Sequence, residues 1–250
     1  MKSNPFVTFY HKPTQWLEAI QLGSGTLLRL SRQTKTIHSA LATLNQLSPD
    51  DYLEFMIAYY ETGYKRFGES WGYVDLLTML QAATTVLKPQ QYLEIGVRRG
   101  RSLAIVANAM PTCDLYGFDL WIENYAGMTN PGPDFVRAEL KRLKYTGQLT
   151  LISGDSKETV PQFLNDQADL YFDLITVDGD HSEVGAKTDL ENVIDRLKVG
   201  GVLLLDDIGH PQHRYLETLW DKLITENDDF DSMKYTELGY GIAFAIRRRQ

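Results

Sequence analysis

The sequence lacks the features that define several large classes of protein. Cys113 is the only cysteine among 250 residues, which excludes a disulfide-stapled scaffold. No apolar run approaches the ~20 residues that a membrane-spanning helix needs, and residues 1–6 lack the apolar stretch of a signal peptide. The 19 glycines and 9 prolines follow no triplet period, which excludes a collagen-like chain. These absences predict a cytoplasmic protein.

Positive charge is also in short supply. Lys and Arg number 25 against 33 Asp and Glu, which gives a formal net charge of −8 at pH 7. Such an acidic surface repels nucleic acid and anionic lipid, so we expect neither as a partner. The hydrophobic content of 43% is high enough for a buried core. A globular protein that acts on a small molecule is therefore the expectation.

The first part of the chain has helical patterning. Ser48 is followed by Pro49 and two acids, which predicts a helix start with Ser48 as the cap. A second helix is predicted over residues 73–87, ending before Pro89. We take residues 1–69 as an N-terminal helical extension and residues 70–250 as the main domain. The extension is expected to cover a substrate pocket or to form a homo-oligomer interface.

From residue 91 short apolar runs alternate with helix-length segments. This alternation predicts an α/β fold with a doubly wound, mostly parallel sheet and helices on both faces. Two final strands, 232–238 and 241–247, predict an antiparallel hairpin at one edge. In such sheets ligands bind beyond the carboxyl ends of the strands. The predicted parallel strands are 92–97, 115–119, 149–153, 172–178 and 202–206, and the helices between and after them are 101–109, 133–143, 157–164, 184–197 and 214–224.

The first strand ends in a glycine-containing turn. Gly96 permits a tight turn, and Gly100 lets the start of the next helix approach a ligand. Arg98 stands where a dinucleotide fingerprint has its middle glycine, which argues against a pyrophosphate over this turn. Glu94, inside the strand end, suits a cationic or amine-bearing ligand. An ordinary strand–turn–helix connection is the alternative.

The next two strand ends also carry acids. Asp119 is placed to accept hydrogen bonds from ribose hydroxyls, or else to cap a helix. Trp121 could cover an adenine ring or pack against the protein. Asp155 and Ser156 could bond an adenine amino group, and Asp155 could also cap the helix that follows.

Acidic residues converge at the last two strand ends. Asp178 and Asp206 are separated by one strand–helix–strand unit, so we expect them on neighbouring strands, with Asp207 beside them. Like-charge repulsion in one cleft predicts a divalent cation such as Mg²⁺, unless the acids cap helices or face water. His181 could act as a general base, and His210 and His213 could touch substrate or metal.

Taken together, these motifs resemble those of the class I S-adenosylmethionine-dependent methyltransferases. The similarity extends to the divalent-metal O-methyltransferases of the catechol type and to the macrocin and cephalosporin-hydroxylase-like natural-product group. The residues that carry it are 93–97 with Gly100 and Ser102, then 117–119, 154–156, 177–182, and 200–201 leading into 205–207.

The resemblance implies a seven-stranded sheet and roles for particular residues. The donor would be bound by Glu94, Gly96, Gly100, Ser102, Asp119, Trp121, Asp155, Ser156 and Asp178, and the metal by Asp178, Asp206 and Asp207. His181 falls where the catechol enzymes place a lysine base, which leaves Asp178 and Asp180 as alternatives.

The function expected from this resemblance is methyl transfer from S-adenosylmethionine to a hydroxyl of a natural product, sugar or phenol, assisted by a divalent metal. Three alternatives stay open. They are a metal-independent methyltransferase, a non-methylating S-adenosylmethionine-binding protein and, least favoured, a nicotinamide dehydrogenase.

Overall fold

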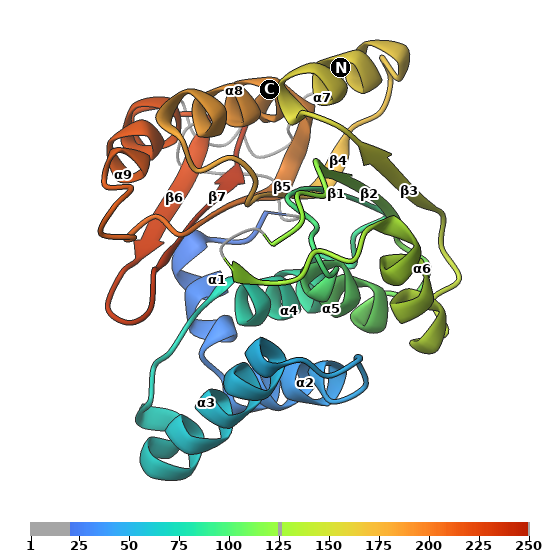
Figure 1. Cartoon of the computed structure of the whole chain (residues 1–250). Helices are drawn as coiled ribbons and strands as arrows, with labels where there is room; N and C mark the ends of the chain where they lie inside the picture. Colours follow the sequence, from blue (N-terminus) through green and yellow to red (C-terminus); the bar gives the residue numbers. More distant parts are fainter. Residues whose placement is uncertain (1–20, 125–126, 250) are drawn as a thin grey trace.

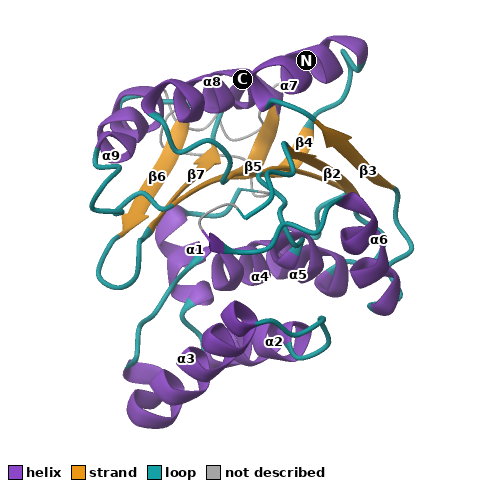
Figure 2. Ribbon diagram, in the orientation of Figure 1, coloured by secondary structure: helices purple, strands orange, loops and turns teal. Residues whose placement is uncertain are grey.

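The computed structural model describes residues 21–124 and 127–249, and one seven-stranded sheet forms its centre (Figures 1 and 2). The strand order is β3-β2-β1-β4-β5-β7-β6. The first five strands run parallel, and β7 is antiparallel to both β5 and β6. This confirms the predicted fold class and the closing hairpin. The strands are β1 Gln91–Ile95, β2 Asp114–Asp119, β3 Leu149–Ser153, β4 Phe172–Val177, β5 Leu197–Asp206, β6 Phe230–Tyr235 and β7 Ile242–Arg247.

Helices cover both faces of the sheet. On one face lie α1 Ser24–Ser31, α4 Leu76–Leu87, α5 Arg101–Ala109 and α6 Pro133–Arg142. On the other lie α7 Ser156–Asp166, α8 Glu183–Val193 and α9 Tyr215–Trp220, the last continuing as a π-helical turn. Successive residues of the central strands enter opposite cores: Tyr92 packs on the first side and Leu93 on the second. This is the pattern of strands buried on both faces.

One strand begins earlier than predicted. Leu197 pairs with Phe172 of β4, so β5 starts at Leu197 and α8 ends at Val193. The apolar spacing of the segment 184–197 suggested that the helix continues to Leu197. Pairing with the neighbouring strand, which that spacing does not reveal, decides the boundary instead.

The N-terminal helices form a further layer outside α4 and α5 (Figure 1). This layer contains α2 Thr34–Leu44 and α3 Asp51–Phe67. Ile37 and Leu53 from these helices belong to the same buried cluster as Leu80 of α4 and Val106 of α5. The described part of the extension therefore shares a core with the sheet domain, and the boundary at residue 69 stays a prediction.

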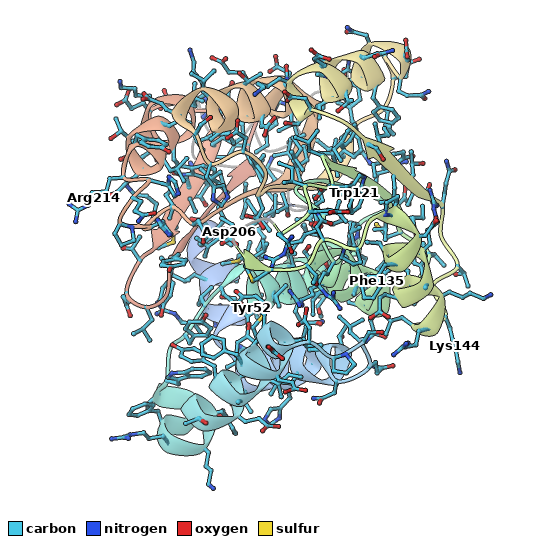
Figure 3. The ribbon with its side chains drawn as sticks, viewed as in Figure 1. Tyr52, Trp121, Phe135, Lys144, Asp206 and Arg214 are labelled. Carbon is cyan, nitrogen blue, oxygen red and sulfur yellow. The ribbon has the colours of Figure 1, made fainter. Side chains whose placement is uncertain are left out.

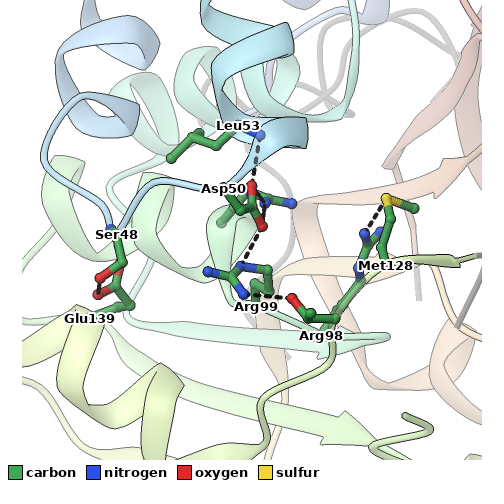
Figure 4. Close-up of polar contacts among 9 residues, drawn as sticks. Ser48, Asp50, Leu53, Arg98, Arg99, Met128 and Glu139 are labelled. Atoms are coloured by element: carbon green, nitrogen blue, oxygen red, sulfur yellow. Dashed lines mark hydrogen bonds and ion pairs between the residues drawn. The ribbon is translucent and has the colours of Figure 1, made fainter. Parts of the chain in front are cut away.

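The prediction that Ser48 caps the third helix is wrong. Asp50 is the cap, and its carboxylate accepts a hydrogen bond from the Leu53 backbone N–H at 2.8 Å. Ser48 instead donates its N–H and hydroxyl to Glu139 of α6, at 2.6 and 2.7 Å (Figure 4). Glu139 is only 3% exposed, and these two donors satisfy its buried carboxylate. The segment before α3 is thereby tied to the sheet domain.

The start of α4 is also later than predicted. Asp75 caps it, accepting from the Thr78 N–H at 3.0 Å, while the Thr78 hydroxyl accepts from the Asp75 N–H at 3.1 Å. The helix therefore begins at Leu76 rather than at residue 73. Within the described ranges, no helix combines the length and apolar character needed to cross a membrane.

Candidate active site

A cavity of about 470 Å³ lies at the carboxyl ends of β1, β4 and β5, where the sequence predicted a ligand site. One wall is the sheet edge with Gly96, Val97, Asp178, Asp206 and Asp207, together with Ser102 of α5. The opposite wall is aromatic and comes largely from α3. Its residues include Tyr52, Phe55, Tyr59 and Tyr60, and Tyr73 and Tyr240 also line the cavity. Figure 3 labels Tyr52 and Asp206, one from each wall.

Gly96 allows two strand ends to approach closely. Its φ of +93° is a conformation that glycine adopts readily. A Cβ at this position would overlap the backbone carbonyl of Asp178. Gly100, with φ +70°, caps α5 and packs against Val136. Gly96 and Ser102 line the cavity, whereas Gly100 supports the turn from behind, and the donor contacts of all three stay predictions.

Glu94 lies beneath the cavity and outside its lining. It is fully buried, and it accepts hydrogen bonds from the hydroxyls of Tyr92, at 2.7 Å, and Ser102. Burial raises the pKa of Glu94 to about 8, against the lowering effect of these two hydrogen bonds. Its predicted contact with a ligand amine stays a prediction, because in this arrangement Ser102 stands between the carboxyl and the cavity.

Asp119 holds the turn after β1 against the loop after β2. Its carboxylate accepts from the backbone N–H groups of Arg98, at 2.7 Å, and Trp121, at 2.5 Å. The Trp121 indole N–H donates to the Ser153 hydroxyl at 2.9 Å. The ribose and adenine roles of Asp119 and Trp121 stay predictions. Tyr125, from the same loop, lies outside the described residues.

Asp155 caps α7, as one of its two predicted roles required. It accepts from the Lys157 backbone N–H at 3.0 Å, and Ser156 is the first residue of the helix. The Lys157 ammonium lies 3.4 Å from Asp155 and 3.5 Å from Asp180. Asp180 is thus engaged outside the cavity, and contacts of Asp155 and Ser156 with adenine stay predictions.

The three acids at the ends of β4 and β5 come together as predicted. Val177 pairs with Leu205, so Asp178 and Asp206 follow neighbouring strand positions. Burial, then the charges of Asp178 and Asp207, raises the pKa of Asp206 well above its usual range. Burial and the Asp178 charge raise the pKa of Asp207 to about 6.

His181 lies between two of these acids. Its Nε2 is 3.2 Å from Asp178 Oδ1, and its Nδ1 is 3.5 Å from Asp207 Oδ2. Burial alone would lower the pKa of His181, but the hydrogen bond to Asp178 and the acid charges raise it on balance. The ring is outside the cavity lining, so Asp178, and not His181, stands at the cavity wall.

Two further histidines continue from His181 outside the cavity lining. The rings of His213 and His181 are 5.7 Å apart, and His210 is 4.6 Å from His213. The sequence does not indicate this row of rings, because the loop that carries His210 and His213 has no pattern of its own.

The acids do not fit the predicted three-ligand metal centre. Throughout residues 21–124 and 127–249, no three His, Cys, Asp or Glu side chains are grouped so that they could hold a metal ion. His181 already contacts one carboxylate oxygen of Asp178 and one of Asp207. The metal stays a prediction from the sequence, and we derive no chemical step through it.

The aromatic wall on α3 belongs to the extension that was predicted to cover a substrate pocket or to form an oligomer interface, although core packing was the expected role of most of its rings. Tyr52, Phe55 and Tyr59 recur at the spacing of one helix face, and neighbouring rings are 6.3 and 6.0 Å apart. Their exposed fractions are 41, 61 and 37%, unusual for large aromatic side chains. The spacing was available as a signal, but an apolar helix face more often predicts core packing.

A buried acid supports the loop that follows β4. Asp189 of α8 is 0% exposed, and its carboxylate oxygens receive no hydrogen bond within the described part of the chain. An alanine Cβ at Gly179 would lie 3.3 Å from it. Burial raises the pKa of Asp189 from 3.8 to about 6. The folded state therefore binds this proton more tightly than the unfolded state does.

Asp189→Asn is expected to stabilise the protein at neutral pH. The folded state binds the Asp189 proton more tightly than the unfolded state does. This difference contributes fully to the free energy of unfolding below about pH 3.8, and the contribution is lost as the pH rises through about 6. The substitution should raise the unfolding free energy at pH 7 by about 3 kcal/mol and have little effect at pH 4. Urea unfolding at both pH values measures this, with the exposed Asp166→Asn as control. Equal effects at the two pH values would contradict it.

Known proteins with a similar fold include methyltransferases. Residues 93–208 match a family described as a methyltransferase domain. No curated protein matches the chain. Among solved structures, the O-methyltransferase TomG from Streptomyces achromogenes, involved in tomaymycin synthesis, superposes with a TM-score of 0.57 at 16% identity. The match covers 81% of this chain and 92% of TomG.

Two further structures have the same fold. An O-methyltransferase from Bacillus cereus gives a TM-score of 0.55 at 14% identity, over 86% of this chain and 91% of its own. A putative caffeoyl-CoA O-methyltransferase from Staphylococcus aureus gives a TM-score of 0.55 at 16% identity. The match covers 78% of this chain and 98% of that structure. The resemblance to class I methyltransferases is confirmed in fold, and residues 93–208 are similar to a methyltransferase domain family.

Proposed function

We propose that this chain, whose residues 93–208 match a methyltransferase domain family, transfers a methyl group from S-adenosylmethionine to a hydroxyl of a small molecule. One observation carries the proposal. The cavity joins the Gly96 turn to a half-buried carboxylate, Asp178, and to an aromatic wall. A donor at the turn and an acceptor against the aromatic rings would meet beside Asp178.

Each wall has a separate task in this reaction. S-Adenosylmethionine, when bound, supplies an electrophilic methyl group on a sulfonium cation. The Gly96 turn leaves room for the donor to approach the backbone. The aromatic wall orients the acceptor and excludes water from one side. Asp178 accepts the hydroxyl proton as the oxygen attacks, and His181, hydrogen-bonded to Asp178, positions that carboxylate.

The acceptor class is tested separately from the donor. TomG is described as an enzyme of tomaymycin synthesis, and CalS11 as a TDP-rhamnose 3'-O-methyltransferase of calicheamicin biosynthesis. We extend this to a natural product, sugar or phenol. Incubation with methyl-labelled S-adenosylmethionine and a panel of phenols, sugars and amines tests it. Label in methyl ethers supports the proposal, whereas label only in amines or esters contradicts it.

The same samples distinguish a methyltransferase from a protein that binds S-adenosylmethionine without transferring its methyl group. Calorimetry first establishes whether S-adenosylmethionine binds. Binding without label transfer to any acceptor class would favour a non-methylating binding protein. Failure to bind would revive the nicotinamide alternative.

Metal dependence is tested independently of the acceptor. Because His181 already bridges Asp178 and Asp207, we expect turnover to survive removal of divalent ions. Activity is measured after dialysis against a chelator and again after adding Mg²⁺. A loss of turnover that Mg²⁺ restores would reinstate the metal site predicted from the sequence.

A further inference from the structure

Arg98 projects into the cavity from the turn after β1. It has φ +51°, an uncommon conformation for a residue with a side chain. Its backbone N–H is held by Asp119, and its side chain lines the cavity. The guanidinium carbon lies 5.6 Å from the centre of the Tyr52 ring on the aromatic wall. The turn thus presents a cation between the two halves of the site.

Two neighbouring arginines pair with one acid. Arg99 Nε lies 2.8 Å from an oxygen of Asp50, and Arg101 Nη2 lies 2.6 Å from the other (Figure 4). Two guanidinium groups therefore share a single carboxylate. The guanidinium of Arg98, the third arginine here, does not lie within 4.0 Å of that carboxylate.

Among the residues that the structure describes, Arg98 has no counter-ion. Its terminal N–H meets the Met128 sulfur, which is a weak acceptor (Figure 4). Its Nε is buried and has no hydrogen-bond partner in the described ranges. Within these ranges no carboxylate oxygen lies within 4.0 Å of its guanidinium. A buried donor with no acceptor is costly, and guanidinium groups match carboxylates in two-point geometry.

The charges of the cavity are therefore segregated. The acids Asp178, Asp206 and Asp207 lie at the ends of β4 and β5, and Arg98 lies at the turn after β1. The donor of the proposed function carries an ammonium, a sulfonium and one carboxylate. The acidic end suits the two cationic groups, which leaves the carboxylate in need of a cation.

We propose that Arg98 binds a carboxylate of a ligand in this cavity. The inference rests on the proposed function. The carboxylate belongs to the methionyl end of the donor or to an acidic substituent on an aromatic acceptor against Tyr52. Arg98 is then a binding residue that selects charged ligands.

Binding measurements test this without turnover. Calorimetry compares S-adenosylhomocysteine with its decarboxylated analogue on the wild type, Arg98→Gln and the control Arg66→Gln, an exposed arginine of α3. If the donor supplies the carboxylate, the wild type and Arg66→Gln prefer S-adenosylhomocysteine by at least about tenfold, and Arg98→Gln loses that preference. Thermal unfolding confirms that the variants are folded.

A second arm addresses the acceptor. The three proteins, saturated with S-adenosylhomocysteine, are titrated with benzoate and with benzyl alcohol. If the acceptor supplies the carboxylate, only the wild type and Arg66→Gln prefer benzoate. Unchanged preferences of Arg98→Gln in both arms would overturn the inference. A wild type that does not bind S-adenosylhomocysteine at all would instead overturn the proposed function.

Discussion

Asp178→Asn is expected to lower kcat by roughly 10²–10⁴-fold, the usual contribution of a general base. The substitution preserves the size of the side chain and removes its capacity to take a proton. Asp178 lines the cavity and is hydrogen-bonded to His181, whereas the alternative base, Asp180, is engaged by Lys157 and by the Ser182 N–H. Affinity for S-adenosylhomocysteine should change by less than about tenfold. Initial rates of label transfer and calorimetry measure both quantities.

The matched variants decide between the acids. Asp166→Asn, on the exposed end of α7, should have wild-type activity. Asp180→Asn should lower kcat far less than Asp178→Asn, because Asp180 faces Lys157 and not the cavity. A larger loss in Asp180→Asn would move the proton acceptor to that residue. An equal loss of donor affinity and kcat in Asp178→Asn would assign it to donor binding.

The strand ends could be predicted because a parallel sheet gives them a common edge. The strand–helix alternation alone predicts that Asp178, Asp206 and Asp207 follow neighbouring strands. The pairing of β4 with β5 confirms that these two strands are neighbours. The glycine turn followed from local chemistry in the same way. Gly96 has positive φ and meets the Asp178 backbone, as a tight turn at a strand end requires.

What could not be predicted depends on contacts between distant segments. Ser48 has the residue type of a helix cap, yet the buried Glu139, far along the chain, takes its donors. His181 follows Asp178 by three residues, but its position behind Asp178 and Asp207 depends on how the β4 and β5 ends pack. Likewise, the aromatic face of α3 is the same pattern whether it packs in a core or lines a cavity.

Gly96→Ala is expected to damage both the fold and donor binding. Two penalties act together. An alanine at φ +93° is strained, and its Cβ would overlap the Asp178 carbonyl, which belongs to backbone and cannot rotate away. Relief requires the β1 and β4 ends to separate, which displaces Asp178 and opens the Gly96 turn. We expect a loss of about 3 kcal/mol or more in unfolding free energy. Urea unfolding measures it.

Gly127→Ala separates the two penalties. Gly127 also has positive φ, +75°, but no atom of the described residues lies within 4 Å of the Cβ that alanine would add. Strain alone should cost about 1 kcal/mol there. The excess in Gly96→Ala then measures the contact between the two strand ends. If folded Gly96→Ala binds S-adenosylhomocysteine as the wild type does, the donor does not use this turn, because no alanine fits there without moving the Asp178 backbone.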